Sequence, residues 1–193
     1  NLILAAFGSA QTVFGIYFKL QSFVFMPVFG LNNGMVPIIA YNYGAGHKDR
    51  VIKTIKHSVA YGVGIMFVGL LAMHIFPAQL MRMFDAEESL IAIGAPALET
   101  ISLSFVFAGF CIVAGSVFQA LGNGVYSMIV SVARQMCVLL PVAKLLSLSG
   151  EVTLIWWAFP IAELASVLLT SYFLVRIYRK VICHIGEPVV QDA

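Results

Sequence analysis

Charged residues are scarce in this chain: Asp, Glu, Lys and Arg make up 10% of its 193 residues, against about a quarter in an ordinary soluble domain. The net charge of +2 is too small to indicate a nucleic-acid partner. Hydrophobic residues reach 61%, and the mean hydropathy is +0.96. These values exclude a typical soluble domain and predict an all-α, polytopic transmembrane helix bundle in a lipid bilayer.

Cysteine and histidine are also rare, with 3 and 4 residues respectively. Cys111 and Cys137 lie in apolar runs and Cys183 in a basic tail, so no paired spacing indicates a disulfide framework or a metal site. The histidines lie at or near predicted helix ends, and no aspartate lies within a predicted span. We therefore expect no cofactor, no bound metal and no intramembrane enzyme.

Long apolar runs separated by polar turns predict the transmembrane helices, each of which needs about 20 residues to cross a bilayer. We expect the end of a helix at 1–8 and further helices at 10–43, 51–76, 90–121, 125–146 and 153–178. Together they form a transmembrane region over 1–182, followed by a polar tail at 183–193. The helix at 1–8 is expected to begin before Asn1.

Lysine and arginine gather on one predicted side of the membrane. The positive-inside rule places that side, with the C-terminus, in the cytoplasm and so favours the plasma membrane as the location. The two groups are Lys48, Arg50, Lys53, Lys56, Arg176, Arg179 and Lys180 on the cytoplasmic side, against Arg82 and Lys144 on the other.

The helix predicted at 10–43 would be roughly 50 Å long, longer than an apolar bilayer core of about 30 Å. Prolines and glycines interrupt it and are expected to break or bend it. These hinge residues are Pro27, Gly30, Gly34 and Pro37. Asn32 and Asn33 lie among them, and an unsatisfied amide in hydrocarbon costs several kcal/mol, so both must face protein, water or a ligand.

Three charged residues fall at similar predicted depths. Lys19, Glu99 and Glu163 each lie about 14 Å from the outer face if their helices start at the membrane surface. At that depth charges normally pair, line a cavity or mark an ion path. Helical spacing puts Lys19 on one stripe with Met26 and Asn33, which makes all five residues candidates for a substrate or ion cavity. Alternatively, overlong helices project outward and leave Lys19 and Glu99 near the headgroups.

Arg134 lies about nine residues into the helix predicted at 125–146. It can extend its head group toward the nearer surface, or hold a carboxylate or backbone carbonyl of a neighbouring helix. We favour the second role, a structural clamp.

Three ordered segments carry a family resemblance. GLNNGMVPIIAYNYGAGHKDRV, VFQALGNGVYSMIVSVARQMCVLLP and WWAFPIAELAS together resemble the second half of a bacterial multidrug and toxic compound extrusion (MATE) transporter. The resemblance implies twelve helices in two six-helix lobes, of which this chain holds the end of helix 7 and helices 8–12. It also implies an absent N-terminal lobe as partner, and export of organic, often cationic, drugs in exchange for sodium ions or protons by alternating access.

The resemblance also assigns architectural or hinge roles to Pro27, Gly30, Pro37, Arg134 and Pro141. Some members hold a coupling carboxylate in the tenth helix, where this chain reads VFAGFCIVAG without an acid. Coupling through this lobe would then require Glu99 or Glu163. The alternative within the same superfamily is a lipid-linked oligosaccharide flippase, which calls for a more basic cavity than Lys19 and Arg134 alone provide.

Overall fold

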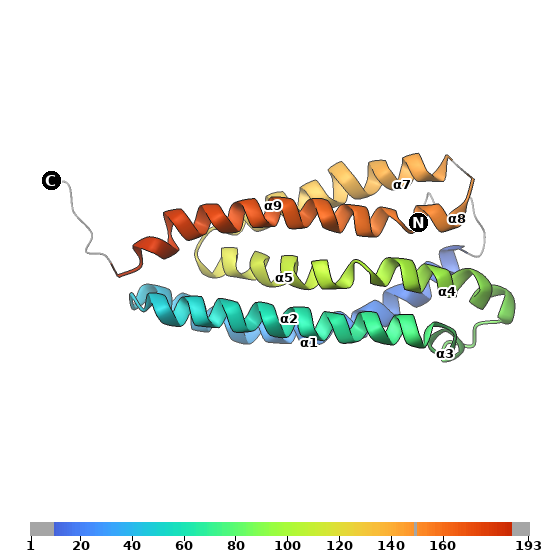
Figure 1. The fold of residues 1–193 in the computed structure, drawn as a ribbon, viewed down its shortest axis with the longest axis horizontal. Helices are drawn as coiled ribbons and strands as arrows, with labels where there is room; N and C mark the ends of the chain where they lie inside the picture. Colours follow the sequence, from blue (N-terminus) through green and yellow to red (C-terminus); the bar gives the residue numbers. More distant parts are fainter. Residues whose placement is uncertain (1–9, 149, 187–193) are drawn as a thin grey trace.

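The computed structural model describes residues 10–148 and 150–186, and these residues form an all-helical bundle without strands. Figure 1 shows α1, α2, α5 and α9 running along the long axis of the molecule. A continuous core of buried apolar side chains joins them. The predicted helix end at 1–8 and most of the tail lie outside the described residues.

The first two helices form a long hairpin. α1 spans Ala10–Gly44 and α2 spans Lys48–Ile75, close to the predicted bounds. α1 continues through both of its prolines, so the helix is not broken; Figure 1 shows its dark-blue first part inclined to the rest. The short α3, Pro77–Arg82, follows α2.

The prediction of a single helix over 90–121 is wrong. The structure has α4, Glu88–Ser102, and α5, Phe105–Ala120, with a bend of 46° between them. At the break, Ser102 Oγ donates to the Glu99 carbonyl and Ser104 Oγ to the Ile101 carbonyl, at 3.0 and 2.6 Å. Serine hydroxyls that bond to nearby backbone carbonyls bend helices, which explains the break.

The helix predicted at 125–146 is present but not regular. α6, Gly124–Val132, passes into a π-helical segment, η2, over Ala133–Leu139, and then into α7, Leu140–Ser147. Pro141 near the start of α7 has no N–H to donate to the carbonyl four residues earlier. The wider hydrogen-bond register of η2 ends just before this proline, so we attribute the π segment to it.

The last helix starts later than predicted. A single turn, α8 at Val152–Ile155, precedes α9, Ala158–Lys180. Pro160 explains where α9 begins, because proline fits in the first turn of a helix, where its missing N–H is not needed. A short 3₁₀ turn, η3 at Ile182–His184, follows. The start of the predicted tail is therefore packed, and the Cys183 carbonyl accepts a hydrogen bond of 2.7 Å from Lys48 Nζ.

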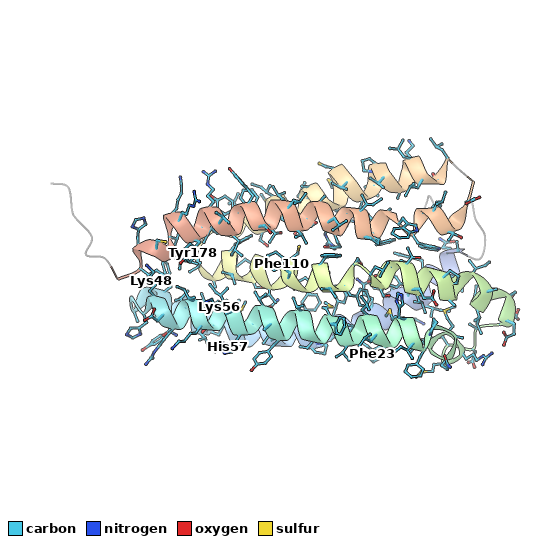
Figure 2. All side chains as sticks on the ribbon, viewed as in Figure 1. Phe23, Lys48, Lys56, His57, Phe110 and Tyr178 are labelled. Carbon is cyan, nitrogen blue, oxygen red and sulfur yellow. The ribbon has the colours of Figure 1, made fainter. Side chains whose placement is uncertain are left out.

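The α1–α2 connection and the end of α9 meet at one end of the bundle, called the basic end here. Figure 2 shows Lys48 and Tyr178 there, and the sequence places the seven clustered lysines and arginines on the same elements. Four described helical stretches are long and apolar enough to cross a membrane, and α4 with α5 makes a fifth if the bent pair is one span.

The interface between α2 and α5 depends on glycine. A Cβ on Gly109 would lie 2.8 Å from Met66 Cγ and 3.0 Å from the Gly62 carbonyl oxygen. Small residues allow helix backbones to approach closely in membranes, where packing rather than hydrophobicity drives association.

We expect Gly109→Ala to lower the stability of the full-length protein relative to Gly64→Ala. Alanine improves helix propensity equally at both sites, but nothing lies within 4 Å of a Cβ on Gly64. Overpacking at Gly109 should cost about 1–3 kcal/mol. The apparent Tm of the two purified variants in detergent measures the difference, and equal Tm values would contradict the close α2–α5 packing.

Candidate functional site

A buried ion pair links η2 to α9. Arg134 Nη1 donates to Glu163 Oε1 at 2.6 Å. The Glu163 side chain is 7% exposed, whereas that of Arg134 is 41% exposed. The second carboxylate oxygen of Glu163, Oε2, is buried and has no hydrogen-bond partner among the described residues. A carboxylate this buried requires its counter-charge, because an isolated charge in a low-dielectric interior is strongly unfavourable.

One cavity, of about 340 Å³, extends from the pair toward the basic end. It lies between α1, α5, α9 and the α6–η2 span, and we call it the basic-end cavity. Its lining is rich in amides and hydroxyls, and the Asn32 Oδ1 atom there is buried without a hydrogen-bond partner in the described structure. The polar lining includes Asn32, Asn33, Ser127, Ser131, Ser166 and Thr170.

A second cavity, of about 440 Å³, extends from the pair toward the opposite end and is called the far-end cavity. Aromatic side chains dominate its wall, and several are in contact: the Phe159 ring centroid lies 6.0 Å from that of Phe14 and 6.1 Å from that of Tyr17. The aromatic lining comprises Phe14, Tyr17, Phe18, Phe25, Trp156 and Phe159.

The ion pair lies where the two cavities meet. Arg134, Glu163 and the small Ala108 of α5 line both of them. Arg134 is near the middle of the apolar stretch Gly124–Ser147. The pair therefore separates a polar cavity from an aromatic one, far from either end of the bundle.

Only two of the five predicted cavity residues line a cavity in the structure. Glu163 lines both cavities and Asn33 lines the basic-end cavity. Lys19, Met26 and Glu99 line neither. Lys19 is exposed, with Nζ 5.6 Å from the centre of the Phe84 ring in the α3–α4 connection, and Met26 is 64% exposed. Neither described ion pair includes Lys19 or Glu99, so the two residues contribute to neither cavity nor ion pair; the shared depth of Lys19, Glu99 and Glu163 stays a prediction.

The predicted hinge residues of α1 share an exposed face. Pro27, Gly30, Gly34 and Pro37 all lie there, and nothing approaches within 4 Å of a Cβ placed on either glycine. Within the described lobe these glycines therefore pack against no other helix. Pro141 is exposed on α7, while Arg134, expected as a clamp, forms the ion pair.

Sequence reasoning missed the aromatic wall of the far-end cavity. The predicted stripe on α1 passed through Lys19 and Met26, but the cavity face instead carries Tyr17, Gln21 and Phe25. Apolar residues surround the helix on all sides, so the alternation of polar and apolar residues does not mark its inner face. The signal available was the recurrence of aromatic residues on this face, at Phe14, Tyr17, Phe18 and Phe25, interrupted by Gln21.

The fold and this site define a polytopic α-helical membrane protein with internal cavities. The family model MatE matches residues 3–145. The chain therefore belongs to the MatE family, whose members are transporters and not enzymes.

Curated relatives agree with this assignment. The multidrug export protein MepA of Staphylococcus haemolyticus (strain JCSC1435) is 26% identical over 181 residues, which is 93% of this chain and 40% of that protein. MepA of Staphylococcus aureus (strain N315) is 29% identical over 165 residues, or 84% of this chain and 36% of that protein. The chain thus spans about two fifths of the length of these relatives.

Solved structures show the same fold. The MATE multidrug transporter DinF-BH, solved in complex with a ligand, superposes with a TM-score of 0.80 at 33% identity, covering 91% of this chain and 40% of that one. The Vibrio cholerae MATE transporter VcmN in its bent form gives a TM-score of 0.86 at 17% identity, covering 95% and 42%. At that lower identity the likeness concerns the fold alone.

We expect Arg134→Met to destabilise the full-length protein, because it leaves the buried Glu163 carboxylate without its counter-charge. Loss of one partner of a buried pair costs about 3–5 kcal/mol, and the partial exposure of Arg134 favours the lower end of this range. Adding Glu163→Gln should recover most of the loss. Thermal unfolding of the parent, both single variants and the double variant measures the coupling; an Arg134→Met variant as stable as the parent would show that the pair does not hold η2 to α9.

Proposed function

We propose that the full-length protein is a secondary active transporter that exports organic, often cationic, drugs in exchange for sodium ions or protons. The chain described here would be one of its two lobes, with the N-terminal lobe as partner. The observation that carries the proposal is the pair of internal cavities on either side of the Arg134–Glu163 ion pair, in a chain of the MatE family.

The cavity walls fit drug-like cations. Aromatic rings attract organic cations through their negative faces, and six aromatic side chains line the far-end cavity. Volumes of about 340 and 440 Å³ are typical of small-molecule sites. The relatives MepA and DinF-BH are named for multidrug export and transport, which favours the same class of substrate here. A lipid diphosphate would require more positive charge than Arg134 supplies.

Alternating access gives the exposed face of α1 a role. This face carries large apolar side chains, among them Phe23 at 73% and Tyr41 at 73% exposure. We propose that it contacts the N-terminal lobe and lipid, and that the bend in α1 changes as the lobes rock. The positive-inside rule places the basic end, with the C-terminus, on the cytoplasmic side of a bacterial inner membrane.

Efflux from energised cells tests the proposal. Cells that express the full-length parent should export ethidium faster than control cells. A proton uncoupler should stop the export if protons drive it, and removal of the sodium gradient should stop it if sodium does. Absence of export of ethidium and of other organic cations would instead favour transport of a lipid-linked substrate.

A cavity-filling variant tests where the drug passes. Ser131 lines the basic-end cavity and its neighbour Val132 lines neither cavity. We expect Ser131→Trp to reduce ethidium efflux by about tenfold, a loss of roughly 1.4 kcal/mol, because the indole occupies the space that the drug requires. Val132→Trp is the matched control and should retain efflux at equal expression. Equal efflux by both variants would exclude this cavity from the path.

A further inference from the structure

We propose that Glu163 binds the coupling cation in this lobe and that the Arg134 guanidinium takes the cation's place when the site is unloaded. The inference rests on the proposed function and names the residues that couple cation binding to drug transport. The cation is monovalent, either a proton or a sodium ion. Its exchange with Arg134 would connect ion binding to drug release.

The position of Glu163 fits a site that must be reached from two sides. Glu163 is among the residues that line both the basic-end cavity and the far-end cavity, so a cation that reaches it can arrive through one and leave through the other. Glu88, by contrast, pairs with Arg82 in an ion pair whose side chains are 79% and 61% exposed. Only the Arg134–Glu163 pair, of the two described ion pairs, lies between cavities.

The carboxylate has an unused binding position. Oε1 accepts from Arg134, but the buried Oε2 has no hydrogen-bond partner in the described part of the chain. Buried polar atoms are almost always satisfied, and the exceptions call for a physical explanation. A buried oxygen without a partner, on a residue that lines two cavities, is accounted for if it receives a cation once Arg134 moves away.

Arg134 can leave Glu163 without unfolding the helix. Its side chain is 41% exposed and lines both cavities, so the guanidinium can turn into either of them. It also lies in the π-helical segment η2, and such segments occur frequently at functional sites within helices. The long, flexible side chain supplies the reach for this movement.

Among the residues that the structure describes, the surroundings of Glu163 add no other permanent charge. Tyr17 from α1 and Cys111 from α5 are the other titratable groups that interact electrostatically with both members of the pair; both are neutral when protonated. With Arg134 in contact the site is therefore neutral. When Arg134 turns away, one proton on Oε2 or one sodium ion at the carboxylate restores neutrality, as a low-dielectric interior requires.

This exchange gives a mechanism for antiport. A cation that binds Glu163 releases the guanidinium charge into the cavities, where it repels an organic cation. When the cation leaves, Arg134 returns to Glu163 and the cavities regain a neutral lining that accepts the drug. The cation and the drug then exclude each other, although they need not share a contact with the protein.

The test uses the full-length protein in proteoliposomes with ethidium as the drug. One arm imposes a pH gradient alone and another a sodium gradient alone, so the arm that drives the parent identifies the cation. Glu163→Gln should lower gradient-driven transport by at least about tenfold, and the driving cation should change equilibrium ethidium binding to this variant by less than about threefold, because no carboxylate remains for the cation to bind. Glu88→Gln, the same change in an exposed Arg–Glu pair, should behave as the parent in both assays.

Driven transport by Glu163→Gln within about twofold of the parent would overturn the inference. So would ethidium binding to Glu163→Gln that the driving cation still weakens by about tenfold, since the cation would then bind elsewhere. A parent without any ethidium transport would count against the proposed function instead. Arg134→Gln provides a second readout, by equilibrium binding: the driving cation should weaken ethidium binding to the parent by at least about tenfold but to Arg134→Gln by less than about threefold. Full competition in Arg134→Gln would exclude the guanidinium as the cation's substitute.

Discussion

The Arg134–Glu163 ion pair lies in the middle of an apolar bundle and constrains how the surrounding helices pack. Glu163 is almost fully buried, so its charge is tolerable only beside a counter-charge that no water can replace. Arg134 meets this need from a different helix, which holds η2 against α9. The two cavities exist because the pair and the small Ala108 leave space on either side. The position of the cavities, and hence the proposed transport path, follows from this one contact.

Irregular helix geometry brings the two partners together. A regular helix through 125–146 would turn the residues before Pro141 to different faces, whereas the wider π segment allows Arg134 to reach α9. Pro160 starts α9 only a few residues before Glu163. On the opposite side, α5 approaches α2 closely through Gly62 and Gly109. Proline and glycine thus help to determine where the pair and its cavities lie, although neither residue type contributes a polar side chain to the site.

The sequence alone predicts the fold class well and the site only in part. Apolar run lengths locate α1 and α2 to within a few residues, because the bilayer sets the length of each span. The break at Ser102–Ser104 escapes prediction, since it depends on local hydrogen bonds that a hydropathy pattern does not encode. The π segment also escapes prediction, because Pro141 indicates a disturbed helix but not its hydrogen-bond register. Glu163 was predicted from its charge at depth. Lys19 was assigned to the same layer because depth along a helix does not reveal which side of it faces the bundle.

The most direct measurement is a cryo-EM structure of the full-length protein, free of drug, at a resolution that shows side chains. The account predicts the Arg134 guanidinium in contact with the Glu163 carboxylate, with the basic-end cavity on one side of the pair and the far-end cavity on the other. A structure in which Arg134 extends to the membrane surface, while Glu163 bonds to a different partner, would contradict it.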